Sequence, residues 1–219
     1  MTDTAATTLT VAGTTYTIGQ AVDRFARYPR KTPARFDYPS RGEHGTVTSE
    51  EIRRTRYVSS RISHAEGDYF IARAADAPWI DAGADLAEAN PDERGELFDA
   101  MSDLYWHFAG TAPKGVSFAK VSKVLHLKHP AAFPLLDSRL WKAYRAAARA
   151  ISVRYPDLRQ SQCRWIAVRE DLIAARSTGA IQRLRGALAG YEHEDKATEQ
   201  GVRAMTVLTD VRILDVLTW

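Results

Sequence analysis

The stretch that decides the fold is Pro113-Lys-Gly-Val-Ser-Phe-Ala-Lys-Val-Ser-Lys-Val-Leu125, which resumes as Phe133-Pro-Leu-Leu-Asp-Ser-Arg-Leu140. A tight turn around Gly115 leads directly into valines and a leucine at helical spacing, which predict a short helix that ends before Pro130. The exposed amides of such a turn and the positive end of the following helix together form an anion site. We therefore expect a negatively charged ligand at this turn.

Lysines surround the turn, and a second set of basic residues follows it at spacings of three and four, through Arg149. Lysines close to a turn are usually exposed. Backbone amides and lysines recognise charge and not base sequence, so the pattern favours the phosphates of a nucleic acid. The predicted nucleic-acid contacts are Lys114, Gly115, Ser117, Lys120, Lys123, Arg139, Lys142 and Arg145.

Charge is unevenly spread along the 219 residues, although the net charge is only +3. Residues 113–169 contain 12 Lys and Arg against 2 acids, whereas residues 66–103 contain 11 acids against 2 arginines. Residues 24–61 hold 10 basic and 4 acidic residues. Such segregation indicates an anionic partner for the basic regions. In the alternative interpretation, the acidic stretch 66–103 folds over the basic segment and neutralises it.

Outside this segment the pattern is mainly helical. Two β-prone runs, 9–11 and 16–18, flank a glycine and predict a small hairpin, and residues 29–48 are rich in Pro and Gly and predict a loop. We expect an N-terminal hairpin and loop over 1–48, then a helical domain over 49–219 that contains the turn segment at 113–140.

Several helix boundaries follow from local signals. Asn90-Pro-Asp-Glu93 is the clearest helix start, with Asn90 as the cap, and Gly110 should end that helix. One helix is predicted from Ser138 to about Ile151, with Asp137 as its cap, and a buried closing helix over 201–219.

The turn segment resembles the helix-hairpin-helix DNA glycosylase superfamily. Gly115-Val-Ser117 is similar to that family's hairpin, with serine in place of its second glycine, and Asp137 is similar to its essential aspartate, 22 residues after Gly115. The resemblance implies a mainly α fold of glycosylase type with the small N-terminal β hairpin added. It also implies that Asp137 is the catalytic acid. Ala119 stands where some members carry a nucleophilic lysine, which implies a hydrolytic, monofunctional enzyme.

Three further pieces, 47–52, 123–137 and 212–219, resemble an uncharacterised family of actinobacterial proteins. That resemblance concerns the fold and carries no activity.

Other candidate residues have simpler roles. Trp106 and Trp141 are candidates for stacking on a base. We expect no metal and no cofactor, because His126 and His129 have no nearby carboxylate to complete a ligand set. The single cysteine, Cys163, excludes an intrachain disulfide and is expected in the core. No apolar run approaches the ~20 residues of a membrane span, so we expect a soluble, cytoplasmic protein.

The sequence thus predicts a nucleic-acid-binding protein of helix-hairpin-helix type that contacts DNA phosphates without sequence preference, with a monofunctional glycosylase as its enzymatic form. Two alternatives remain open. One is a non-catalytic interaction or scaffold protein that keeps the glycosylase-like fold, and the other is an enzyme that acts on a nucleotide or nucleoside. An open cleft lined by aromatic residues around Asp137 would favour an enzyme.

Overall fold

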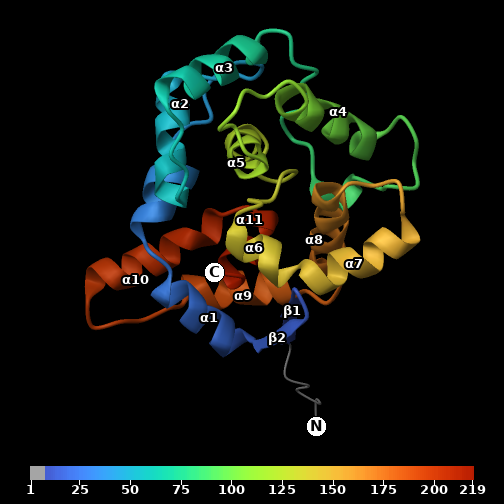
Figure 1. Cartoon of the computed structure of the whole chain (residues 1–219). Helices are drawn as coiled ribbons and strands as arrows, with labels where there is room; N and C mark the ends of the chain where they lie inside the picture. The colour runs from blue at the N-terminus through green and yellow to red at the C-terminus, as the bar shows by residue number, and fades with distance from the viewer. Residues whose placement is uncertain (1–7) are drawn as a thin grey trace. The chain divides into compact units, whose positions relative to one another are not determined.

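The computed structural model (Figure 1) describes residues 8–219. These residues fall into two units. Unit 1 combines residues 8–30 with residues 139–219, and unit 2 comprises residues 31–138. The sequence suggested a boundary after residue 48. The two units instead divide after residue 30 and after residue 138. Unit 2 contains the whole turn segment up to Ser138, whereas the basic residues that follow belong to unit 1.

Unit 1 opens with the predicted hairpin, in which β1 (Thr8–Val11) pairs antiparallel with β2 (Thr14–Thr17). Ala12 and Gly13 form its two-residue turn with φ values of 52° and 77°, as tight hairpin turns require. The backbone N–H of Ala12 donates to Asp171 Oδ2 at 2.7 Å, which fixes the turn to helix α8.

The remainder of unit 1 is helical. In it α7 packs on α8, and α1 packs on α9 and α11. Cys163 and Trp165, both on α8, are fully buried, which confirms the expected core position of the cysteine. The helices are α1 (Ile18–Arg27), α6 (Ser138–Ala143, whose first residue ends unit 2), α7 (Arg145–Arg154), α8 (Gln160–Ser177), α9 (Ala180–Ala189), α10 (Lys196–Arg203), a 3-10 turn (Ala204–Val207) and α11 (Asp210–Leu217).

Two helix predictions in unit 1 are wrong. The single helix expected from Ser138 is broken at Tyr144, where ψ is 12° and the side chain is buried at 1% exposure. The closing helix is also interrupted, because Leu208 is extended and Thr209 caps a new helix, α11, by accepting from Arg212 N–H. The apolar spacing continues across both interruptions, so periodicity alone could not reveal either break.

Unit 2 is built around α5, whose residues 121–128 are all buried. Helices α2 and α4 pack against it. Its elements are a π-helical turn (Pro33–Asp37), α2 (Ser49–Arg54), a 3-10 turn (Thr55–Val58), α3 (His64–Ala74), a 3-10 turn (Leu86–Glu88), α4 (Leu97–Ala109) and α5 (Phe118–Lys128).

The helix start expected at Asn90 is also wrong, because α4 begins seven residues later, at Leu97. Asn90 instead closes a turn, in which its Oδ1 accepts from Asp92 N–H and its amide donates to Glu93. Gly95 follows at φ +77°, a left-handed conformation that no helix interior contains. The end of α4 at Gly110 and the end of α5 before Pro130 are as predicted.

Within residues 8–219, every helix is too short or too polar to cross a membrane.

Candidate nucleic-acid interface

The predicted hairpin is a surface turn between α4 and α5. Val116 N–H donates to the Pro113 carbonyl at 3.1 Å and closes the turn, and Gly115 takes φ +105°, which favours glycine. Lys114, Gly115 and Ser117 are all exposed. The turn therefore presents the backbone of Gly115 and the side chain of Lys114 to solvent.

Ser117 is the N-cap of α5, as a serine in this position should be. Its side chain accepts from Lys120 N–H at 3.4 Å, and its φ and ψ of −85° and 162° are extended. The next two residues, Phe118 and Ala119, contribute the first amides of an 11-residue helix. Those amides and the positive end of the helix point out of the turn, where an anion is favoured.

A carboxylate from the acidic stretch lies on this turn. Glu66 Oε1 is 2.6 Å from Lys120 Nζ, and the same oxygen is 2.6 Å from where a Cβ on Gly115 would stand. Burial favours a raised pKa for Glu66, but the hydrogen bond from Lys120 and those from Ser63 outweigh it and lower the pKa. Glu66 stays ionised and forms an ion pair with Lys120, so one predicted phosphate contact already has an internal partner.

Lys123 lies inside unit 2 and not at its surface, so the expectation that it is exposed is wrong. The residue is only 4% exposed, on the buried face of α5. Burial lowers the pKa of Lys123, and the negative charge of Asp137 opposes that shift. Lys123 therefore acts on Asp137, not on a phosphate at the surface.

Asp137 lies half-buried on the segment that joins α5 to α6. Ser122 on α5 holds this segment, because its hydroxyl accepts from Leu136 N–H at 3.2 Å. The N–H of Asp137 itself donates to the Leu135 carbonyl at 2.7 Å. The structure thus places one partly accessible carboxylate on this segment, and Ala119 on α5 supplies no nucleophile.

The basic stripe of unit 1 is divided by the break at Tyr144. Lys142 lies on α6, Arg145 begins α7, and both are exposed. Arg139 has an internal contact, because its guanidinium lies 4.2 Å from the Trp219 ring centroid and donates to the Trp219 carbonyl at 3.2 Å. Its position is therefore set by the C-terminal segment.

The aromatic candidates differ in what surrounds them. Trp106 is half-buried and meets the ring of Tyr105 edge-on at 5.2 Å. Trp141 is half-buried, and Arg164 covers one ring face at 3.5 Å from the centroid. Sequence reasoning missed Phe118, which is 42% exposed at the first position of α5. Its place just after a capping serine and before the apolar stripe could have indicated that exposure.

The histidines make internal contacts. His126 lies 2.6 Å through Nδ1 from the Phe133 carbonyl, and His107 Nε2 lies 2.7 Å from the Arg73 carbonyl. Between residues 8 and 219 there is no group of three His, Cys, Asp or Glu side chains that could hold a metal ion.

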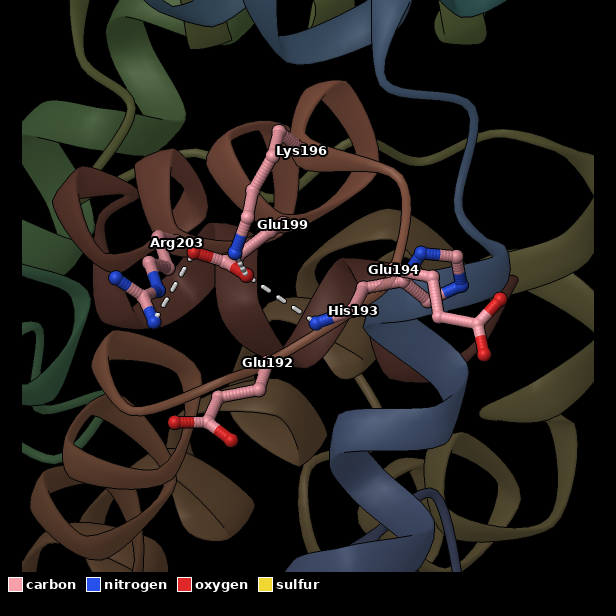
Figure 2. Close-up of a pocket in the computed structure, with 6 residues that line it drawn as sticks. All are labelled: Glu192, His193, Glu194, Lys196, Glu199 and Arg203. Atoms are coloured by element: carbon pink, nitrogen blue, oxygen red, sulfur yellow. Dashed lines mark hydrogen bonds and ion pairs between the residues drawn. The ribbon is translucent and has the colours of Figure 1, made fainter.

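A polar depression of about 490 Å³ lies on unit 1 between α10 and the loop before it (Figure 2). At its centre Glu199 pairs with Lys196 at 2.9 Å and with Arg203 at 3.2 Å, and it accepts from the backbone N–H of His193. Figure 2 shows Glu192 and Glu194 directed away from this network. The central carboxylate of the depression is therefore already satisfied by these groups.

Comparison with known proteins gives one family. No curated protein matches the chain, and no solved structure matches it. Residues 78–219 match the model of DUF6308, described as a family of unknown function. This region includes α4, α5, the segment around Asp137 and every helix of unit 1 after it. Since the match covers well over half of the sequence, the chain belongs to the DUF6308 family.

Proposed function

We propose that the protein binds nucleic acid without sequence preference, by seating a backbone phosphate on the turn 113–117. The observation that carries this proposal is the exposed Gly115 at φ +105°, which leads within three residues into the N-terminus of α5. A glycine there lets a phosphate approach the backbone, and the helix end supplies amides and partial positive charge. The resemblance to helix-hairpin-helix proteins supports the same assignment.

The binding should be weak and sensitive to salt. Lys114 is the one lysine of the turn that is exposed and without an ion pair among the described residues, since Lys120 contacts Glu66 and Lys123 is buried. Each neutralised phosphate contributes about −0.9 to the slope of log K against log salt. With one or two such contacts we expect micromolar or weaker affinity and a shallow slope. Lys142 and Arg145 remain candidate contacts on unit 1.

The test is a titration of a duplex oligonucleotide over a series of salt concentrations. Lys114→Ala should weaken binding several-fold at low salt and make the slope shallower, equally for unrelated sequences. Lys196→Ala is the matched control, because Lys196 is an exposed lysine of unit 1 that pairs with Glu199. Absence of binding by the wild type at low salt, or equal losses in the two variants, would overturn the proposal.

A second function, hydrolytic removal of a base, is favoured by Asp137, a partly accessible carboxylate on the segment between α5 and α6. A carboxylate can stabilise a developing cationic sugar and orient water. In this role Asp137 is the catalytic residue. Trp106, which belongs to the same unit as Asp137, would then stack on the extruded base.

This second function is tested by base release from duplexes with alkylated, deaminated or oxidised bases. Asp137→Asn should abolish release and leave DNA binding unchanged, because asparagine keeps the size of the side chain but not its charge. Borohydride should trap no covalent adduct, since Ala119 cannot form one. If the wild type releases no base from any duplex, the non-catalytic binder is the better description.

A further inference from the structure

Arg164 of α8 is a buried cation in unit 1 that sequence reasoning did not single out. It is 3% exposed, and its guanidinium lies 3.5 Å from the centroid of the Trp141 ring. Nε donates to the Trp141 carbonyl at 3.3 Å, and Nη1 donates to the carbonyl and the side-chain oxygen of Gln160 at 2.8 and 3.0 Å. These contacts hold the guanidinium plane in one orientation.

The second terminal nitrogen of this guanidinium has no such contact. Among residues 8–219, no group accepts a hydrogen bond from Arg164 Nη2, and no carboxylate forms an ion pair with Arg164. Nη2 is also not one of the fully buried polar atoms that lack a partner, so it still reaches the surface. This nitrogen of a fixed guanidinium therefore keeps some contact with solvent.

The electrostatic surroundings of Arg164 are positive. Burial lowers its pKa, and the guanidinium of Arg145 acts in the same direction. The one group that opposes them is Cys163, and burial raises the pKa of that thiol, so it is neutral at pH 7. Buried charges are normally paired, since isolation in a protein interior is costly. Arg145 begins α7 four residues after Trp141, the residue that Arg164 contacts through its ring and its carbonyl. Two guanidinium groups in this region without an acid are a site that an anion would stabilise.

We infer that Arg164 Nη2 and the guanidinium of Arg145 bind a phosphate monoester at the surface of unit 1. A phosphate monoester carries about −1.5 to −2 charges at pH 7, which balances two guanidinium groups, whereas a carboxylate balances one. A guanidinium also matches two phosphate oxygens with two parallel N–H donors. This site goes beyond the proposed turn interface, because it lies in the other unit and requires no duplex.

The ligand has two possible sources with the same chemistry: a small phosphate ester, or the terminal phosphate of a nucleic acid strand. Inorganic phosphate is the first probe, and the full-length protein is titrated with it while the thermal unfolding temperature and the Trp fluorescence are recorded. Trp141 stacks on Arg164, so its emission should change on binding. The second probe is a pair of identical single-stranded oligonucleotides, with and without a 5′-phosphate.

Three variants test the assignment. Arg145→Ala removes an exposed side chain and should weaken phosphate binding about tenfold, in line with the loss of one charge-assisted contact. Arg164→Gln should weaken it further. Arg149→Ala is the matched control on α7, an exposed arginine one turn further along, and should leave binding unchanged.

Each result of these experiments supports or contradicts the inference. The inference holds if phosphate binds and Arg145→Ala weakens it while Arg149→Ala does not. Preference for the 5′-phosphorylated oligonucleotide over inorganic phosphate then identifies a strand end as the ligand, and equal binding identifies a small ester. It fails if the wild type does not respond to phosphate or if Arg145→Ala and Arg149→Ala behave alike. Lys114→Ala should leave this site intact, so its result stays separate from that of the turn interface.

Discussion

Lys128 in unit 2 and Arg164 in unit 1 are both buried cations, but their surroundings are opposite. Lys128 Nζ donates to Glu51 Oε1 at 2.7 Å and to the carbonyls of Arg41 and Glu43. All three donors of this ammonium are used, and the charge is neutralised. Among residues 8–219, Arg164 has carbonyl contacts but no carboxylate partner, and Arg145 begins α7 four residues after the Trp141 that Arg164 contacts. The first arrangement holds a loop in place, whereas the second has binding capacity left for an anion.

Removing the Lys128 charge should have the largest effect. Lys128→Met removes the closer cation of the buried Glu51 and leaves only Arg54, whose Nη2 lies 3.9 Å from the same oxygen. Breaking a buried pair in this way costs about 3–5 kcal/mol. Urea unfolding of the variant should show this loss directly. Arg164→Met should cost less in phosphate-free buffer, because no buried acid is left behind.

A double variant provides the control. Lys128→Met combined with Glu51→Gln removes both charges of this pair and should recover part of the stability, although the buried Arg54 then loses its contact with Glu51. A loss below about 1 kcal/mol in Lys128→Met alone would contradict the distinction between the two cations, since measured values for broken buried pairs lie well above that.

Acid should produce the next largest effect, by giving unit 2 a buried cation without an acid. His129 is 1% exposed and follows Lys128 directly. Burial lowers the pKa of His129 to about 4, and the nearby His44, Lys128 and Arg41 add to the shift. Because the folded pKa lies below the ordinary value near 6.5, the unfolded chain binds the extra proton first. Stability should therefore fall from about pH 6.5 to about pH 4, by about 3 kcal/mol in total.

The measurement is urea unfolding at pH 7.5, 5.5 and 4.5, with His129→Gln as the matched variant. The variant should lose the part of the pH dependence that belongs to this imidazole. Unit 1 should behave differently, because burial raises the pKa of Asp171 and that carboxyl is stabilising in its protonated form. If His129→Gln and the wild type lose stability in parallel, the imidazole is not the group that titrates.

These buried cations also show where sequence reasoning reached its limit. The N-terminal hairpin, the end of α4 at Gly110 and the predominance of helix follow from glycine and proline positions and apolar periodicity, which are local signals. The burial of Lys123 and Lys128 is not local. It depends on partners such as Glu51, 77 residues away in the chain, which no periodicity encodes. Arg164 was missed for the same reason.

A substitution at Thr48 is a smaller change that tests the contacts around Glu51, the partner of Lys128. Its side chain caps α2, and its N–H and hydroxyl both donate to Glu51 Oε2, at 2.8 and 3.0 Å. Thr48→Ala should cost about 1 kcal/mol in urea unfolding, the usual value of a lost cap. Thr48→Ser keeps the hydroxyl and should remain within a few tenths of the wild type. Equal losses in both variants would show that the methyl group matters and the cap does not.

The smallest expected effect concerns the ion pair of Lys120 and Glu66, whose side chains are only partly buried. The lysine and carboxylate side chains are 19% and 12% exposed, and the pair lies directly on the turn that we propose as the phosphate site. Lys120 should therefore be available to DNA only in part, because a phosphate must compete with Glu66. Glu66→Gln removes the negative charge but keeps a side chain that can still accept from Ser63 N–H, so α3 should keep its capping box. We expect this variant to bind a duplex two- to five-fold more tightly at low salt, with a steeper salt slope, since one further lysine becomes free to neutralise a phosphate.

The control is Asp68→Asn, which removes the charge of an exposed acid elsewhere on the same helix and should change affinity less. Unchanged binding by Glu66→Gln, with the fold verified by circular dichroism, would mean that the turn is not where DNA docks, and equal gains in both variants would mean that only net charge matters.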